Sequence, residues 1–545
     1  MMMMKSLLLS VLTLTIALDV LAQDPIVILG RPTNRTITAN IVMDRAGSVC
    51  IAYGKRSEQY SDTSAVFSAE AGVPVVVELS MLSENAMYFY RLLYRNGSTG
   101  TWSSSPQRFF RTQRARGSSF TFLIEADEHL YDKKGIRSVY QRTLDNQRRD
   151  SADFLFSLGD TFGDDHTPDL TTSDDMKDLH RDYLQYLGTA CHSMPFFFCL
   201  GNHEGESGYY LKQNAPNNIA VYGTLWRKYY YSNPVPNTFY SGNMRSEEHG
   251  VGLPENYYAF EWGDALFVVL DVYRHCDVNE KPQGWDWTLG EEQYMWLRTT
   301  LASSAARHKF VFAHHVRGQG RGAASMVSGY EWGGYEPNKN QFTFGTKRPG
   351  WEAPIHELFK RYGVNAFFQG HDHLYAKEMV DGIVYQEVPM PSDSTYEIGV
   401  LANADAYTDL TMDGSGYLRV RVDPDKAVVE YVATYLPNHE TAERKNGQVR
   451  YSYTVDMRTT GVDDDPVAVV TDGAVYPQPA SSTITFPMLR DGGVVELYDA
   501  LGQHVATFDL EVADVRQIPN GTYVARVRTA GSVQILPIRI CHESR

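Results

Sequence analysis

The chain has 545 residues, with 66 acidic and 50 basic side chains and a formal net charge of -16 at pH 7. This length exceeds what one hydrophobic core normally supports, so we expect two or three domains. An acidic surface repels a polyanion over a long footprint, which argues against a nucleic-acid platform. The five cysteines lack the paired spacing of a structural zinc site. Cys199 lies within an apolar run, so we expect a buried free thiol there.

Residues 1–22 have the features of a secretory signal peptide. Lys5 precedes a mostly apolar run from Leu7 to Leu21, and Ala22 ends a small-residue cleavage site. A signal anchor is the alternative, but the run is short for a membrane span and contains Asp19. No later stretch is long and apolar enough to cross a membrane. We therefore expect a secreted or cell-surface protein with no transmembrane segment in the mature chain.

Residues 25–113 predict a small β-sandwich. The segment consists of short runs of apolar and β-branched residues separated by turn-rich stretches such as Asn96-Gly97-Ser98. No long helical pattern interrupts them. The predicted strands include 26–29, 48–53, 75–79 and 87–92.

Residues 118–435 predict a layered α/β domain, because strand-like runs here alternate with helical patterns. The predicted strands are 120–124, 154–158, 196–200, 310–312 and 364–368. The predicted helices are 135–149, 173–187, 290–306 and 352–362, each with apolar residues three and four apart.

The remainder of the chain returns to a β pattern. Residues 436–466 contain the acidic stretch Gly461-Val462-Asp463-Asp464-Asp465-Pro466 and are expected to be a linker. Residues 467–545 contain short predicted strands at 494–498 and 523–527, with Asn520-Gly521 as a turn before the second. A third, small β-domain is therefore expected at the carboxyl end.

Polar residues follow each predicted strand of the middle domain, where an α/β sheet builds its site. Two divalent cations need about four to six ligands each and a shared carboxylate to offset their repulsion. Asp160, which follows a strand alone, is our choice for that bridge. The remaining ligands divide into Asp127, His129 and His373 for the first ion, and Asn202, His314 and His371 for the second. Since His371 and His373 are two apart, a local turn at Gly370 must aim one at each ion.

The ordered motifs in this domain resemble the calcineurin-like metallophosphoesterase family, whose pattern is Asp-x-His, Gly-Asp, Gly-Asn-His-(Asp/Glu), His and Gly-His-x-His. The resemblance implies a metallophosphoesterase sandwich of two sheets flanked by helices over residues 118–435. Residues 257–264 and 267–271 further resemble the purple acid phosphatase branch. The strands around Tyr88-Phe89-Tyr90-Arg91 and Phe109-Phe110-Arg111-Thr112 resemble the fibronectin type III-like module that precedes the catalytic domain in that branch. A generic immunoglobulin-like spacer is the alternative.

Two departures separate the chain from the purple branch. That branch places a tyrosine metal ligand three residues after the bridging aspartate, where this chain has Gly163, and it has a glycine where this chain has His129. Neutral nitrogen ligands without a phenolate suit Zn, Mn or ferrous iron. We therefore expect two such divalent ions and a colourless protein.

The same resemblance implies an acid phosphatase-like, metal-dependent hydrolysis of phosphoric esters. His203 resembles the catalytic histidine that protonates the leaving-group oxygen, and Glu204 would orient it. A phosphatase acting on small phosphomonoesters is the leading hypothesis. The alternatives are a phosphodiesterase or nucleotide-cleaving enzyme on the same metals, and a non-catalytic surface adhesin. Arg317 and Arg321 could contact the substrate phosphate or be solvated loop residues.

The carboxyl-terminal segment resembles the sorting domain of the type IX secretion route. The matching residues are Val475-Tyr476-Pro477-Gln478-Pro479-Ala480, residues 496–503 and residues 518–523. The resemblance implies that secretion machinery is a partner of this domain. A carbohydrate-binding or purely structural sandwich is the alternative.

Overall fold

The computed structural model describes residues 24–131, 135–162, 167–318, 320–337, 340–398, 403–456, 481–486, 489, 492–499, 504–528, 533–540 and 542. The predicted signal peptide, Gly163, Cys541, residues 457–466 of the predicted linker and the motif at 475–480 lie outside these residues. Within the described part of the chain, no helix has both the length and the apolar character that a membrane span requires. Cys50, Cys191, Cys199 and Cys276 are buried free thiols, which confirms the expectation for Cys199.

The amino-terminal strands form two sheets around one apolar core. One sheet has the order β1-β2-β6, and the other is β4-β3-β7-β8 with β5 on β3 and β9 on β7. The strands are β1 Ile26–Gly30, β2 Ile37–Val42, β3 Gly47–Gly54, β4 Asp62–Thr63, β5 Phe67–Ala69, β6 Pro74–Leu79, β7 Met87–Asn96, β8 Ser103–Ser104 and β9 Arg108–Arg111. Alternate residues of β7 are buried, so Tyr88, Tyr90 and Leu92 reach a core that also contains Ile41 and Phe110.

The middle of the chain builds two further sheets that face each other. The first catalytic sheet has the order β12-β11-β10-β23-β24-β25, and the second catalytic sheet has the order β13-β14-β15-β16-β19-β21-β20-β22. The first comprises β10 Phe120–Glu125, β11 Phe154–Ser157, β12 Phe196–Phe198, β23 Ser415–Val422, β24 Lys426–Thr434 and β25 Val449–Asp456. The second comprises β13 Ser241–Gly242, β14 Tyr258–Trp262, β15 Ala265–Val269, β16 His308–Phe312, β19 Ala366–Gln369, β20 Tyr375–Val380, β21 Ile383–Glu387 and β22 Leu410–Met412. Phenylalanine rings such as Phe122, Phe156 and Phe312 fill the space between the sheets.

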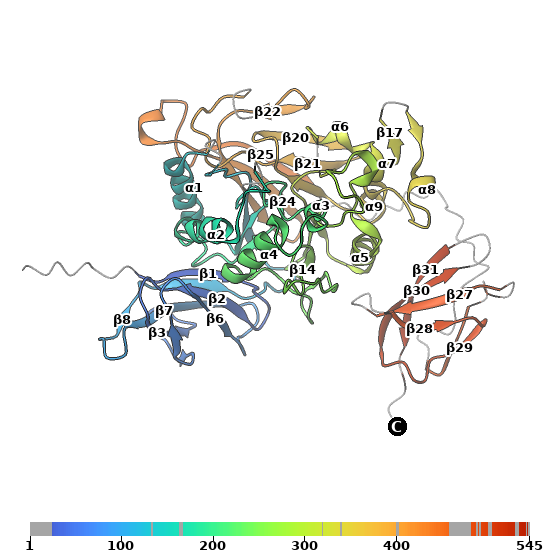
Figure 1. The fold of residues 1–545 in the computed structure, drawn as a ribbon, viewed down its shortest axis with the longest axis horizontal. Coiled ribbons are helices and arrows are strands. Elements are labelled where there is room, and N and C mark those ends of the chain that lie inside the picture. Colours follow the sequence, from blue (N-terminus) through green and yellow to red (C-terminus); the bar gives the residue numbers. More distant parts are fainter. Residues whose placement is uncertain are drawn as a thin grey trace, which may run out of the picture.

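Helices cover the outer face of each catalytic sheet (Figure 1). Those over the first sheet are α1 Arg137–Asp150, α2 Ser173–Leu187 and α4 Ile219–Tyr230. Those over the second include α5 Gly290–Ser303, α7 Tyr330–Gly333 and α9 Ile355–Arg361. The helix α2 starts where predicted because Thr172 and Asp175 form a reciprocal capping box. The result is a multi-sheet α/β fold in which the two catalytic sheets face each other and helices cover their outer faces.

Two features of this domain differ from the sequence expectation. The helix α4 was not predicted, because its sequence IAVYGTLWRKYY is apolar nearly all round and even Arg227 is buried, so no amphipathic period stands out. The expected boundary at residue 435 is too early, since β25 pairs with β24 along its length and extends the first catalytic sheet to Asp456.

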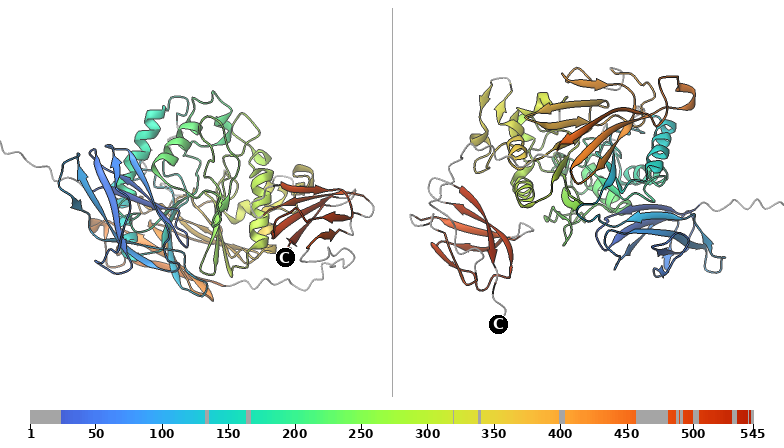
Figure 2. Two further views of the ribbon diagram at one scale, coloured as in Figure 1. Left: turned by 90° about the horizontal axis from the view of Figure 1, so that it is seen from below. Right: turned by 180° about the vertical axis from the view of Figure 1, so that it is seen from behind.

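The amino-terminal sandwich is joined to the catalytic domain by hydrogen bonds and by a shared core. The side chain of Asn40 donates to the Tyr230 carbonyl at 2.7 Å, and the Tyr90 hydroxyl donates to the His192 carbonyl at 2.6 Å. Ile28 and Val42 belong to the same buried cluster as α2 and β12. Both views of Figure 2 show the amino-terminal strands in blue against this part of the molecule.

The carboxyl-terminal residues form a separate small β-domain. Its four-stranded sheet has the order β28-β27-β30-β31, and β26 pairs with β29. The strands are β26 Thr483–Thr485, β27 Val494–Tyr498, β28 His504–Phe508, β29 Val512–Asp514, β30 Gly521–Arg528 and β31 Val533–Ile540. Phe486, Val495, Leu497, Ala525 and Val527 contribute to its core.

Candidate metal centre

The candidate ligands gather at one edge of the two catalytic sheets because of strand direction. The strands β10, β11 and β12 run parallel, as do β15, β16, β19 and β21. Carboxyl ends of parallel strands meet at the same edge of a sheet. Each predicted motif follows one of these ends by a few residues, so segments up to 246 residues apart come together. The sequence predicted this arrangement from apolar runs followed by Asp, Asn or His.

The side chains form three overlapping clusters. Asp127, His129 and His373 form the first, Asp160, His314 and His371 form the last, and His129, Asp160 and His203 form a middle cluster that connects them. The Oδ2 atom of Asp160 lies 3.1 Å from Nε2 of His314 and 3.6 Å from Nε2 of His129. Asp160 therefore lies between the clusters, where a bridging carboxylate would be needed.

The distances between the donor atoms match those between ligands of one metal ion. The Nε2 atoms of His129 and His373 are 3.1 Å apart, and Nε2 of His314 lies 3.3 Å from Nδ1 of His371. Ligand atoms about 2.1 Å from one metal ion lie about 3.0–3.4 Å from each other in octahedral or tetrahedral geometry. Among the described residues, Oδ1 of Asp127 and Oδ1 of Asn202 are buried without a hydrogen-bond partner. Orphaned acceptors among converging imidazole nitrogens are what a metal site requires.

The backbone of this edge is strained at the candidate ligands. Positive φ angles occur at Asp127 (63°), His129 (44°), Asp160 (57°), His371 (85°) and His373 (63°). A non-glycine residue in this region costs about 1–3 kcal/mol, and such residues concentrate at functional sites. The predicted turn at His371 and His373 is thus confirmed.

Two glycines give the ligands room. A Cβ atom on Gly370 would lie 2.4 Å from Oδ2 of Asp127, and one on Gly201 would lie 2.3 Å from Oδ1 of Asp160. We expected Gly370 to supply the freedom for the local turn, but the residues with a left-handed backbone are His371 and His373. Gly370 therefore lets the loop after β19 approach the loop that carries Asp127, which any side chain at this position would prevent.

Glu204 contacts the backbone of the ligand loops. Its carboxylate accepts hydrogen bonds from four backbone N–H groups, those of Gly201 (2.6 Å), Asp160 (3.0 Å), Thr161 (2.7 Å) and Phe162 (3.1 Å). Burial, followed by the charge of Asp160, raises its pKa to about 7. Glu204 thus ties the loop after β12 to the loop after β11, a contact that its place in the sequence did not reveal. Its expected role in orienting His203 stays a prediction.

A second buried acid supports the loop after β19, and sequence reasoning missed it. Glu387 accepts from the Asp372 backbone N–H at 2.9 Å. The Tyr407 hydroxyl lies 2.8 Å from Oδ2 of Asp372 and 3.0 Å from Oε2 of Glu387. Arg321 donates to the His371 carbonyl and to Asp372, both at 2.9 Å. Glu387 ends β21, so the pattern of an acid at a strand end could have pointed to it.

The charges of the site depend on each other. Burial disfavours the charge on Asp160, but His314 and His203 hold its pKa well below the usual range. Burial also opposes charge on His314, yet Asp160 and Asp127 raise its pKa to about 9. In the absence of cations, a proton on His314 therefore balances the carboxylates, and a metal ion would have to displace it. Burial instead lowers the pKa of His371 well below its usual range, so that imidazole is neutral.

His203 lies at the rim of the centre. Its side chain is 19 % exposed, whereas those of His314 and Asp160 are 0 % and 2 % exposed. Its Nε2 atom lies 3.9 Å from Oδ2 of Asp160, and its backbone N–H donates to Oδ1 of the same residue at 2.8 Å. The ring meets that of His129 edge-on, with centroids 5.1 Å apart. An imidazole beside the cluster and open to solvent can exchange a proton with a bound ester.

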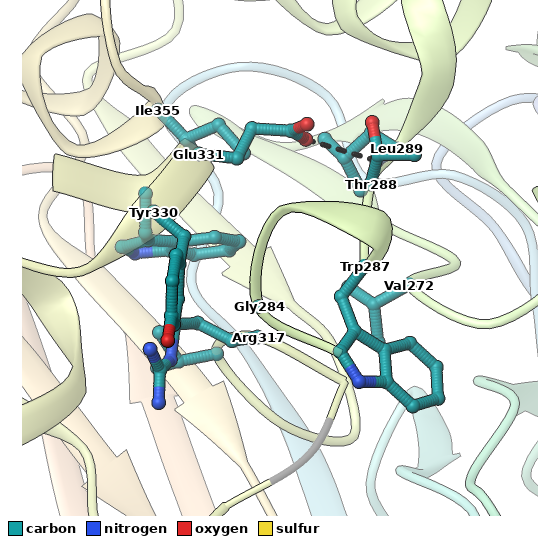
Figure 3. Close-up of a pocket in the computed structure, with 11 residues that line it drawn as sticks. Val272, Gly284, Trp287, Thr288, Leu289, Arg317, Tyr330, Glu331 and Ile355 are labelled. Atoms are coloured by element: carbon teal, nitrogen blue, oxygen red, sulfur yellow. Dashed lines mark hydrogen bonds between the residues drawn. The ribbon is translucent and has the colours of Figure 1, made fainter. Parts of the chain in front are cut away.

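The two arginines after His314 differ. Arg321 is tied to the ligand loop, whereas the Arg317 guanidinium stacks over the Tyr330 ring at 4.8 Å. Figure 3 shows Arg317, Tyr330 and Trp287 around a small cavity. Its volume of about 20 Å³ suits roughly one water molecule. This cavity is therefore too small to be a substrate pocket.

Comparison with known proteins agrees with this geometry. Residues 120–375 match the family model described as calcineurin-like phosphoesterase, and residues 474–538 match that of a secretion system C-terminal sorting domain. No curated protein matches the chain. The solved structure of PhoD is similar with a TM-score of 0.55 and 18 % identity, covering 79 % of this chain and 90 % of that one. A purple acid phosphatase from yellow lupin (Lupinus luteus) seeds has a TM-score of 0.51 and 16 % identity, covering 79 % and 74 %.

The family match over residues 120–375 defines a hydrolase of phosphoric esters, and the two similar structures share its fold. The chain carries a calcineurin-like phosphoesterase domain followed by a secretion system C-terminal sorting domain. The structural neighbours, at identities below one in five, speak for the fold alone.

Proposed function

We propose that the protein is a secreted phosphatase that hydrolyses phosphate monoesters with two divalent metal ions, Zn, Mn or Fe. The observation that carries the proposal is the pair of ligand clusters joined at Asp160. Ions about 3.5–4 Å apart can contact both the attacking and the leaving oxygen of an in-line displacement. A shared carboxylate between two clusters supports that spacing.

The ligands divide between the ions according to the clusters. Asp127, His129 and His373 would hold one ion, Asn202, His314 and His371 would hold the other, and Asp160 would be shared between them. When bound, the ions supply an acidified water molecule and positive charge for the phosphoryl oxygens. Imidazole and carboxylate ligands suit all three metals.

His203 donates a proton to the leaving-group oxygen in this proposal. Its position at the exposed rim lets Nε2 reach an ester that lies over the clusters. The bond from its backbone N–H to Asp160 fixes the imidazole relative to the bridge. Glu204 acts through these loops and is a positioning residue.

The other domains serve export and support. The carboxyl-terminal domain supports a role for secretion machinery as a partner, and residues 1–22 would direct the first membrane crossing. We place the domains at 25–113, with a fibronectin type III-like sandwich, at 118–456 and at 467–545. The catalytic boundary follows β25 and shortens the linker to 457–466.

Metal analysis and two chromogenic substrates on the same full-length sample test the proposal. We expect two divalent ions per chain, a colourless solution, and faster turnover of a phosphomonoester than of a phosphodiester. Preference for the diester would establish the phosphodiesterase alternative. Two bound ions without turnover of either ester would establish a non-catalytic adhesin, and a visible phenolate-to-iron band would refute the metal assignment.

His203 provides a separate test of the chemistry. Replacing His203 with Ala should lower turnover about 100-fold or more, since general acid catalysis contributes about 10²–10⁴-fold. The metal content should stay at two ions, because His203 is not one of the proposed ligands. Loss of an ion would instead make His203 a ligand, through the cluster that it forms with His129 and Asp160. An unchanged rate would remove His203 from the mechanism.

A further inference from the structure

Tyr273 is a buried tyrosine beside the metal centre that the mechanism above does not use. The strand β15 runs parallel to β16, with Val269 opposite Phe312, so Tyr273 and His314 leave the same edge of the second catalytic sheet. The two rings are 6.0 Å apart between centroids. On its other side the Tyr273 ring meets Trp287 edge-on at 5.7 Å.

The hydroxyl of Tyr273 lacks a partner within the described chain. The residue is 1 % exposed, and no described group hydrogen-bonds its oxygen. Two other buried phenols near this edge do have partners: Tyr407 bonds Asp372, and Tyr140 bonds Glu125. Burying an unpaired hydroxyl lowers stability, so a buried orphan donor needs an explanation.

The backbone fixes where this ring can go. The Tyr273 N–H donates to Asp271 at 2.8 Å, and its carbonyl accepts from the Gly208 N–H at 3.0 Å. Gly208 lies a few residues after Asn202 and His203, so this hydrogen bond ties the end of their loop to the backbone of Tyr273. Both backbone bonds of Tyr273 are therefore made within the protein.

The surroundings of Tyr273 are acidic. Burial, followed by the charges of Asp160, Cys199, Glu204 and Asp127, raises the pKa of Tyr273 well above its usual range. A protonated phenol can donate one hydrogen bond, and a phosphate oxygen at the metal centre can accept it.

We propose that the Tyr273 hydroxyl donates a hydrogen bond to an oxygen of the phosphate group bound at the metal centre. Tyr273 would then be a further substrate-binding residue that fixes the phosphate against His314. The inference rests on the proposed function, because it needs phosphate at the metal ions. It excludes a role for Tyr273 as a phenolate ligand that would colour an iron-loaded enzyme.

The test is the binding of inorganic phosphate to the metal-loaded, full-length protein, measured by calorimetry. For Tyr273→Phe we expect unchanged metal content and a dissociation constant raised on the order of 10- to 100-fold, as for the loss of a hydrogen bond to a charged group. Phenylalanine fills the same volume and removes only the orphan hydroxyl, so the metal-free variant should unfold at the same temperature as the wild type or higher.

Tyr230→Phe is the matched control. Tyr230 is also fully buried with an unpartnered hydroxyl, but it ends α4, away from the ligand loops. Its replacement should leave phosphate affinity unchanged. Equal phosphate affinity of wild type and Tyr273→Phe would overturn the inference alone. Loss of a metal ion or of a visible band in Tyr273→Phe would show that Tyr273 is a metal ligand, which would also overturn the inference. A metal-loaded wild type that neither binds nor releases phosphate would overturn both the inference and the proposed function.

Discussion

The two catalytic sheets hold their halves of the metal centre in different ways. In the first half, after β10, β11 and β12, one carboxylate on Glu204 collects four backbone N–H groups. In the second half, after β19, side chains hold the turn: Glu387, Tyr407 and Arg321 all meet at Asp372 or its neighbours. In the first half, one carboxylate therefore joins the loops after β11 and β12, whereas the second half spreads the same task over several side chains.

The largest effect should come from the residue that the halves share. Asp160→Ala removes the proposed bridge and the charge that opposes cation repulsion, so both ions should be lost and turnover should fall by well over 100-fold. Metal content after dialysis and the monoester rate measure this. Asp178→Ala, at an exposed position of α2, is the control. Retention of two ions by Asp160→Ala would show that the halves are independent.

The first half should respond strongly to loss of Glu204. Glu204→Ala leaves four backbone donors without their acceptor in a buried loop pair, and each such group costs about 1–3 kcal/mol. We expect the free energy of unfolding to fall by at least about 3 kcal/mol, measured by urea denaturation of the metal-free protein. Glu204→Gln keeps one acceptor oxygen and should lose less. An unchanged unfolding midpoint for Glu204→Ala would show that the first half does not rely on this carboxylate more than the second half relies on any one of its side chains.

The second half should tolerate the loss of one member. Tyr407→Phe removes a hydroxyl that bonds two carboxylates, but Arg321 and the Gly322 N–H still hold Asp372. Metal affinity should drop about 10-fold, at the low end for partners of metal ligands. Tyr294→Phe, which loses a buried bond to the Ala353 carbonyl far from the ligands, should change stability but not metal affinity. The comparison would be reversed if Tyr407→Phe lowered both the metal affinity and the free energy of unfolding more than Glu204→Ala does.

The last prediction concerns the response of the first half to acid. His180 on α2 packs against Phe162, next to the Asp160 loop, and burial lowers its pKa to about 3. Below the unfolded value of about 6.5, the unfolded chain takes up a proton that the folded chain does not, so the free energy of unfolding falls by up to about 1.4 kcal/mol per pH unit as pH falls towards 3. His180→Phe should remove that contribution. Denaturation at pH 7 and pH 4.5 measures it, and an equal acid loss in variant and wild type would contradict it.

The ligand set could be read from the sequence because it depends on local order. An apolar run followed by Asp160 or His314 predicts both a strand and the side chain at its end, and parallel pairing then brings the ends together. The turn at His371 and His373 was deduced for the same reason, from their spacing.

The supporting residues could not be read in this way. Glu204 was expected to serve its neighbour His203, but its carboxylate reaches across to the loop after β11, a contact set by tertiary packing. Tyr407 and Tyr273 lie outside any motif, and only the fold brings them to the edge. The strand β25 was hidden for a similar reason, since its pairing with β24 follows a connection that reads as linker.

The shared core of the amino-terminal sandwich limits how the enzyme can be divided. Ile28 and Val42 complete a cluster that includes Leu187 and Phe196, and Tyr90 satisfies the His192 carbonyl. A fragment beginning at residue 118 would expose that apolar surface and leave those backbone acceptors open. Expression of the catalytic unit for crystallisation should therefore begin at Asp24, so that the sandwich stays attached and keeps the catalytic domain's apolar surface covered.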